Sequence, residues 1–251
     1  MNRPKCGSAG VAWRYSGGMV TVGILGGMGP AATGQFLIDL TAATPAQVDQ
    51  DHLHAIIDSD PSIPDRTTAI LAGDDAPAAP IRRGLDRLVE WGADLLAVPC
   101  NTAHVFIDQF ADELPVPLVH IVEATLDEAE RRSPGGAWLT GTIGTMRTGL
   151  YQRAAERRGY VLHEPPMALQ ERIMGVIGAV KAGNLNEAGA EFRRVAEELR
   201  AVRELPIVMA CTEIPLAFSR SGLERAVAVS SLEALAKATY EKAQSMRLGG
   251  S

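Results

Sequence analysis

Cysteine and aromatic residues are scarce in this sequence, and long apolar runs are missing from it. Only 3 of the 251 residues are cysteines, and aromatic side chains make up 5%. A small, odd number of cysteines argues against a disulfide framework, so reduced thiols are expected. No apolar run approaches the roughly 18 residues that a membrane span needs, and none is typical of a signal peptide. These absences predict a cytoplasmic protein without a membrane partner.

An excess of positive charge is also lacking, as are the usual patterns of metal and cofactor sites. The formal net charge is -6, which argues against nucleic acid as a partner because phosphate binding favours a basic surface. No two cysteines form Cys-x-x-Cys, so no metal site is expected. The stretch from Gly23 to Pro30 lacks Gly-x-Gly-x-x-Gly spacing, and no pyridoxal lysine motif is visible. No cofactor is therefore expected.

Apolar runs alternate with helical patterns along most of the chain. The run Val20–Leu25 predicts a buried strand, the following glycines a tight turn, and the residues from Ala31 a helix. This alternation indicates an α/β fold with parallel sheets and helices on both faces. Further strands are expected at 53–58, 94–99, 117–121, 137–140, 160–163 and 206–210. Further helices are expected at 81–91, from 103, at 122–132, around 151, and at 168–182 and 185–200.

The pattern starts again near residue 135, and the two halves echo each other. Each half opens with a strand and a loop of small residues, and each later has an apolar strand that leads into a cysteine, Cys100 or Cys211. We interpret this as a pseudo-twofold duplication. The chain is then divided into an extension without expected structure, a first α/β domain, a second α/β domain, and a C-terminal segment predicted to be a helix that returns to the first domain (residues 1–18, 19–134, 135–225 and 226–251).

The matching positions of Cys100 and Cys211 point to acid/base chemistry. Ligands of parallel α/β sheets bind at the carboxyl ends of strands, where both cysteines are expected. Each is also expected at the start of a helix, where the helix dipole lowers a thiol pKa from its free value of about 8.5. One buried cysteine is often only a core residue. Two in equivalent positions suit removal of an amino acid's α-proton from one face and its replacement on the other.

Polar groups directly follow both cysteines. Removal of an α-proton places developing charge on the substrate carboxylate, and without a pyridoxal ring that charge needs fixed donors. Asn101, Thr102 and Thr212 offer backbone N–H groups and side chains at the required places. They are therefore candidates for substrate binding.

Five segments resemble the signature segments of the aspartate/glutamate racemase family, and of its aspartate racemases in particular. They occur in the family's order, and the resemblance spans roughly residues 20–240. It implies two similar α/β domains related by pseudo-twofold symmetry, an active site in the cleft between them, and Cys100 and Cys211 as the paired acid and base. The segments are Gly23–Pro30, Ile63–Thr67, Pro99–His104, Val180–Asn184 and Cys211–Glu213.

The same resemblance assigns substrate-binding residues. Arg66 matches an arginine that holds a substrate carboxylate, a task that suits the two-point geometry of a guanidinium group. Lys181 matches a lysine near the side-chain carboxylate of the substrate. The residues expected to line the cleft are Asn101, Thr102, Thr145 and Thr212.

Four further residues are expected to support the site. Asp65 and Glu213 either tune the thiols or cap a helix N-terminus. His104 either raises the thiolate fraction of the first cysteine or packs against its neighbours. Met28 lies in the glycine-rich loop, whose backbone can approach a carboxylate closely. Asp60 stands where many aspartate racemases have asparagine, and it is expected to place a negative charge near the substrate.

These observations predict a cofactor-independent isomerase that racemises amino acids through two cysteines. Aspartate is the expected substrate, and the resemblance implies a homodimer. A broad-specificity racemase and a glutamate racemase are alternatives that use the same thiols. A maleate isomerase or a decarboxylase-type enzyme is a third alternative, although a decarboxylase uses one thiol. A small-molecule binding protein without activity is a fourth, and it has no need of facing thiols.

Overall fold

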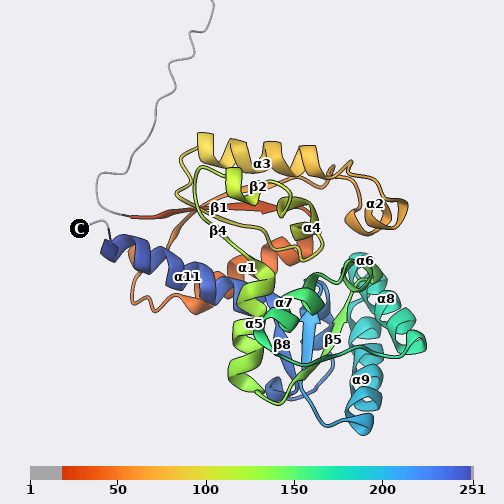
Figure 1. The fold of residues 1–251 in the computed structure, drawn as a ribbon. Coiled ribbons are helices and arrows are strands. Elements are labelled where there is room, and N and C mark those ends of the chain that lie inside the picture. Colours follow the sequence, from red (N-terminus) through yellow and green to blue (C-terminus); the bar gives the residue numbers. More distant parts are fainter. Residues whose placement is uncertain (1–18, 250–251) are drawn as a thin grey trace, which may run out of the picture.

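Residues 19–249 are described by the structure, a computed structural model, and they form two parallel β-sheets surrounded by helices (Figure 1). The prediction for residues 1–18 lies outside the described residues. The α/β class and the pair of parallel sheets expected from the sequence are confirmed. Among the helices of residues 19–249, none is long and apolar enough to cross a membrane.

The first sheet has four parallel strands in the order β2-β1-β3-β4. Its strand β1 is buried along its whole length, because the sheet is covered on both faces and leaves this strand no polar side. The elements of this half are β1 Thr21–Gly26, α1 Pro30–Ala43, β2 His54–Ser59, α2 Arg66–Ala72, α3 Ala78–Glu90, β3 Leu95–Ala97, α4 His104–Ile107, β4 Leu118–Val119 and α5 Ile121–Arg132.

The second sheet repeats the first, with parallel strands in the order β6-β5-β7-β8. Each sheet therefore places its third strand next to the strand that opens its half, so that β3 and β7 are equivalent. The elements of this half are β5 Ala137–Gly141, α6 Ile143–Thr148, α7 Leu150–Arg158, β6 Leu162–His163, α8 Met167–Lys181, α9 Leu185–Val202, β7 Ile207–Ala210, α10 Ile214–Phe218, β8 Ala228–Ser230 and α11 Ser231–Gly249.

The two halves exchange their last helices. Helix α5 follows the first sheet in the chain, but it packs against α7, β7 and β8 of the second half. Helix α11 follows the second sheet, and it packs against α1, β3 and β4 of the first (Figure 1). The segment 226–251, predicted to be a helix alone, thus contains strand β8 before α11, and this strand completes the second sheet.

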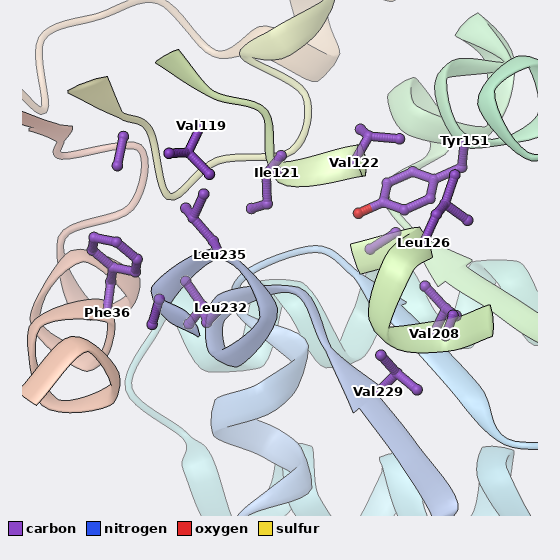
Figure 2. Packing of buried hydrophobic residues seen from close by; sticks show 14 of the residues in the cluster. Phe36, Val119, Ile121, Val122, Leu126, Tyr151, Val208, Val229, Leu232 and Leu235 are labelled. Atoms are coloured by element: carbon purple, nitrogen blue, oxygen red, sulfur yellow. The ribbon is translucent and has the colours of Figure 1, made fainter. Parts of the chain in front are cut away.

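One apolar cluster runs through both halves and joins them. It combines residues of both sheets with residues of α1, α5, α7 and α11, and Figure 2 shows Phe36, Val119, Val208 and Leu235 among them. Two further clusters fill the outer faces, one in each half. Because the central cluster is built from both halves, separating them would expose it to water.

Local sequence signals account for most elements, and the exceptions are short. Helix α2 was not expected, although Asp65 marks its start as an N-cap, accepting a hydrogen bond from the backbone N–H of Thr68. The helix expected from residue 103 is limited to the four residues of α4. Strand β8 was missed because its three residues give too little pattern for a prediction.

Replacing a leucine of α11 should destabilise the protein strongly if the leucine belongs to the central cluster, and hardly at all if it is exposed. Leu235 is fully buried, whereas Leu248 is 80% exposed. We expect Leu235→Ala to lower the free energy of unfolding by about 2–5 kcal/mol, because it removes buried surface and leaves a cavity. Leu248→Ala should change it by less than about 0.5 kcal/mol. Urea unfolding followed by circular dichroism measures both, and equal losses would contradict the shared core.

Candidate active site

A small pocket lies where strands β3 and β7 end, and residues of both halves line it. Every proposed site residue except His104 contributes to its wall. The lining residues are Met28, Asp65, Arg66, Thr67, Cys100, Asn101, Thr102, Thr142, Thr145, Lys181, Ala210, Cys211, Thr212 and Glu213. A larger crevice between α1, α5 and α11 contains none of the proposed site residues. Three lining residues, Thr67, Thr142 and Ala210, were not among the proposed site residues.

Cys100 and Cys211 are both buried, unpaired thiols at equivalent strand ends. Cys100 follows β3, and its Sγ atom lies 3.6 Å from the hydroxyl oxygen of Thr102. Cys211 follows β7, and its Sγ atom donates a hydrogen bond of 3.0 Å to Oε2 of Glu213. The two sulfur atoms are therefore in matching places but have different partners.

The environment of Cys211 favours the protonated thiol. Burial raises its pKa well above the ordinary value, and the negative charge of Glu213 raises it further. Cys211 does not stand at the start of a helix as expected, because the five-residue helix α10 begins three positions after it. Glu213 is thus placed to tune the thiol, one of its two expected roles. It makes no side-chain cap for α10.

His104 does not supply positive charge to Cys100. It is completely buried, and burial lowers its pKa to about 3, with further lowering by the nearby His120. Its Nδ1–H donates to the backbone carbonyl of Cys100 at 2.9 Å, and its Nε2 accepts from the backbone N–H of Ile121. The neutral ring therefore holds the backbone around the thiol, and of its two expected roles the geometry supports packing against its neighbours.

Arg66 is a buried cation without an ion-pair partner among residues 19–249. Its guanidinium donates to the backbone carbonyls of Ile63 and Pro64 through Nη1 and to that of Met28 through Nη2. Its Nε is buried and has no partner. Buried charges are normally paired, and here three backbone carbonyls take the place of a carboxylate partner.

Lys181 and Asp65 connect the two halves at the rim of the pocket. Their charged groups lie 3.7 Å apart, and both side chains are roughly half exposed. Asp65 also caps α2. The same rim holds a close approach of α2 to α6, where a Cβ atom added to Gly144 would lie 3.1 Å from the hydroxyl oxygen of Thr67.

The loop after β1 also contributes to the wall of the pocket, through Met28. Gly27 has a φ of +89°, and a Cβ atom there would lie 2.4 Å from the backbone carbon of Asp60, so this position requires glycine. The loop brings the backbone carbonyl of Met28 to Arg66. The side chain of Asp60 turns instead to Ser62 and lies 4.0 Å from Arg87. Asp60 does not line the pocket, contrary to expectation.

The remaining polar lining is rich in hydroxyl groups. Thr142 caps α6 by accepting from the backbone N–H of Thr145, and the two hydroxyl oxygens lie 3.1 Å apart. Thr212 is buried beside the second cysteine. Among the residues that the structure describes, no group of three or more His, Cys, Asp or Glu side chains is placed to hold a metal ion.

The site thus consists of two α/β halves that each bring one buried thiol to the wall of a single pocket. The family profile described as Asp/Glu/Hydantoin racemase matches residues 25–239. The chain belongs to this family, and it is an amino-acid racemase. This family assignment favours racemisation over the decarboxylase, maleate isomerase and binding alternatives.

Individual relatives agree with this family assignment. The chain is 32% identical over 199 residues to the broad specificity amino-acid racemase RacX of Bacillus subtilis (strain 168), covering 77% of this chain and 85% of that one. Aspartate racemase of Picrophilus torridus superposes with a TM-score of 0.76 at 29% identity, covering 90% and 94% of the two chains. An aspartate racemase homologue from Pyrococcus horikoshii OT3 shares the fold, with a TM-score of 0.72 at 24% identity over 90% and 100%.

The contact between Cys211 and Glu213 predicts how the thiol titrates. Replacing the carboxylate with an amide in Glu213→Gln removes a negative charge, so the pKa of Cys211 should fall and alkylation should begin at lower pH. Peptide-resolved labelling with iodoacetamide across a pH series measures this. Glu224→Gln, at an exposed glutamate of the same half, is the control and should leave the profile in place. An unchanged profile in Glu213→Gln would argue against the electrostatic role of Glu213.

Proposed function

We propose that this racemase inverts its substrate by proton transfer between two thiols, and that aspartate is the preferred substrate. The observation that carries the mechanism is the placement of Cys100 and Cys211, one from each half, in the wall of a single pocket. A substrate bound between the halves would present one face of its α-carbon to each thiol. One thiol removes the α-proton as a thiolate, and the other donates its proton from the opposite face.

The surroundings of the thiols support a division of labour. Burial and Glu213 hold Cys211 in its protonated form, so Cys211 is the acid when Cys100 is the base. For the reverse reaction Cys211 has to lose its proton before it can act as a base. Glu213, whose Oε2 lies 3.0 Å from the sulfur atom, is the acceptor at hand.

Arg66 supports recognition of a carboxylate. Its buried positive charge has no carboxylate partner within residues 19–249, and a substrate carboxylate would supply one. Three backbone carbonyls hold the guanidinium in place, so little side-chain entropy is lost on binding. Asn101, Thr102 and Thr212 add donors for the charge that grows on the carboxylate as the α-proton leaves.

A second cation supports a substrate with two carboxylates. Lys181 lies in the pocket wall, and its contact to Asp65 is long and half exposed, so a substrate carboxylate can compete for it. With Arg66 on one carboxylate and Lys181 on the other, the two cations would match the charges of a short dicarboxylic amino acid. The likeness to the aspartate racemase of Picrophilus torridus also favours aspartate.

A broader substrate range is the second candidate, and the likeness to the broad specificity racemase of Bacillus subtilis favours it. A panel of L-amino acids in deuterated water separates the two, with chirality and deuterium content followed for aspartate, glutamate, and neutral and basic amino acids. The aspartate proposal expects the highest kcat/KM for aspartate. Equal or better turnover of neutral or basic amino acids would overturn it in favour of broad specificity.

Two further parts of the proposal follow from the mechanism and the family. Both thiols have to stay reduced, which favours a reducing compartment such as the cytoplasm. A homodimer is expected from the family resemblance, and analytical ultracentrifugation of the full chain would measure it directly.

The two-thiol mechanism predicts opposite defects in the two serine variants. We expect Cys100→Ser and Cys211→Ser each to lose at least about 10³-fold in racemisation, because a hydroxyl near neutral pH replaces neither thiolate nor thiol. Each variant should still exchange the α-proton of one enantiomer with deuterated water, and the favoured enantiomer should differ between them. Nuclear magnetic resonance measures the exchange. Near-normal racemisation in either variant would contradict the mechanism.

Replacing Arg66 with lysine keeps the positive charge, but we still expect a loss of activity. In Arg66→Lys the ammonium group cannot reproduce the planar, two-point contact to a carboxylate, so we expect kcat/KM to fall by at least about tenfold, mainly through KM. Arg83→Lys, at an exposed arginine of α3, serves as the control. Steady-state kinetics with unchanged KM in Arg66→Lys would remove Arg66 from the substrate site.

A further inference from the structure

A fully buried tyrosine lies behind the pocket without lining it. Tyr151 belongs to α7 of the second half, and Figure 2 shows its ring within the central cluster. Its hydroxyl donates to Oδ1 of Asn101 at 2.6 Å, across the boundary between the halves, and lies 3.2 Å from the hydroxyl oxygen of Thr125. The second half of the molecule thus holds a pocket residue of the first half through a buried hydrogen bond.

The amide of Asn101 is held from two sides. Its oxygen accepts from Tyr151, and its Nδ2 donates to the hydroxyl oxygen of Ser231 at 3.1 Å, at the start of α11. An amide nitrogen carries two N–H donors, and Ser231 takes one of them. Asn101 also lines the pocket, directly after Cys100, so the second donor is available to a bound substrate.

We infer that Tyr151 is a positioning residue for racemisation, fixing the Asn101 amide so that its free N–H meets the substrate carboxylate. The inference rests on the proposed function and adds a residue that does not touch the substrate. If the amide turned over, its oxygen would face the carboxylate in place of the N–H and would repel it. The hydroxyl of Tyr151 opposes this turn, because the amide oxygen would lose its donor in a buried place.

The Tyr151 hydroxyl is suited to a role that does not depend on a change in its protonation. Burial raises the pKa of Tyr151 far above its ordinary value, and negative charge on Cys211 raises it further. The hydroxyl consequently remains a donor around neutral pH, including when Cys211 becomes a thiolate. Thr125, whose own hydroxyl donates to the backbone carbonyl of Ile121, is a second acceptor for the Tyr151 hydroxyl, but at 3.2 Å it is farther away than Asn101 at 2.6 Å.

Kinetics with Tyr151→Phe test the inference. The variant keeps the ring and removes the hydroxyl, and we expect kcat/KM to fall by about three- to tenfold, the loss of one buried hydrogen bond. Asn101→Ala combined with Tyr151→Phe should fall no further than Asn101→Ala alone, because Tyr151 acts through Asn101. Additive losses would overturn the inference. The control is Tyr160→Phe, which removes a hydroxyl that donates to the backbone carbonyl of Ser133, and it should retain full activity.

A spectroscopic measurement tests the contact without relying on turnover. The chain has four asparagines, Asn2, Asn101, Asn184 and Asn186. Selective ¹⁵N labelling of asparagine gives few side-chain amide signals, and Asn101→Ala identifies the one that matters. We expect this signal to exchange slowly with solvent in the wild type and to shift in Tyr151→Phe but not in Tyr160→Phe.

The two measurements separate the possible failures. An Asn101 signal that exchanges fast in the wild type overturns the inference, even if Tyr151→Phe does not fold. An Asn101 signal that is the same in the wild type and in Tyr151→Phe overturns it as well. A wild type without racemase activity overturns the proposed function and with it the catalytic role of Tyr151, while a shifted Asn101 signal would still establish the contact.

Discussion

Two parallel sheets with the same strand order direct the ends of β3 and β7 toward one pocket, and this constraint decides where the reactive side chains lie. The exchange of α5 and α11 between the halves and the apolar cluster they share hold the sheets in this arrangement. The thiols are therefore placed by the packing of the whole molecule, since neither half alone brings a second cysteine to the pocket.

The two cysteines occupy equivalent positions, but their side-chain neighbours differ. Cys100 has a hydroxyl two residues further on, at Thr102, whereas Cys211 has a carboxylate at the same spacing, at Glu213. The carboxylate and burial together keep Cys211 protonated. In the proposed mechanism Cys211 is therefore the thiol that begins as the acid.

The sequence was sufficient for the sheets and for most of the pocket wall. Apolar strands that lead into Cys100 and Cys211 are local patterns, and parallel strands bring their carboxyl ends to one edge, so both positions followed from the pattern. The neutral state of His104 was not predictable, because it depends on burial by β4 and α5, which follow later in the chain.

Long-range contacts explain the other features that the sequence did not predict. Tyr151 reaches Asn101 across fifty positions of the chain, and no local pattern signals a contact of this kind. The isolated charge of Arg66 is also a property of the folded state, since its partners are backbone carbonyls from two separate loops. Asp60 was expected near the substrate, but its neighbour Ser62 offers nearer donors and holds its side chain outside the pocket.

The central claim is that two different groups handle the α-proton, and wild-type turnover in deuterated water tests it most directly. At low conversion of L-aspartate, the D-aspartate formed should carry deuterium at the α-carbon, and the recovered L-aspartate should carry almost none. This follows because the group that donates to the product is not the group that received the substrate proton. Product that retains the original hydrogen, or recovered substrate that gains deuterium as fast as product forms, would contradict the two-thiol account.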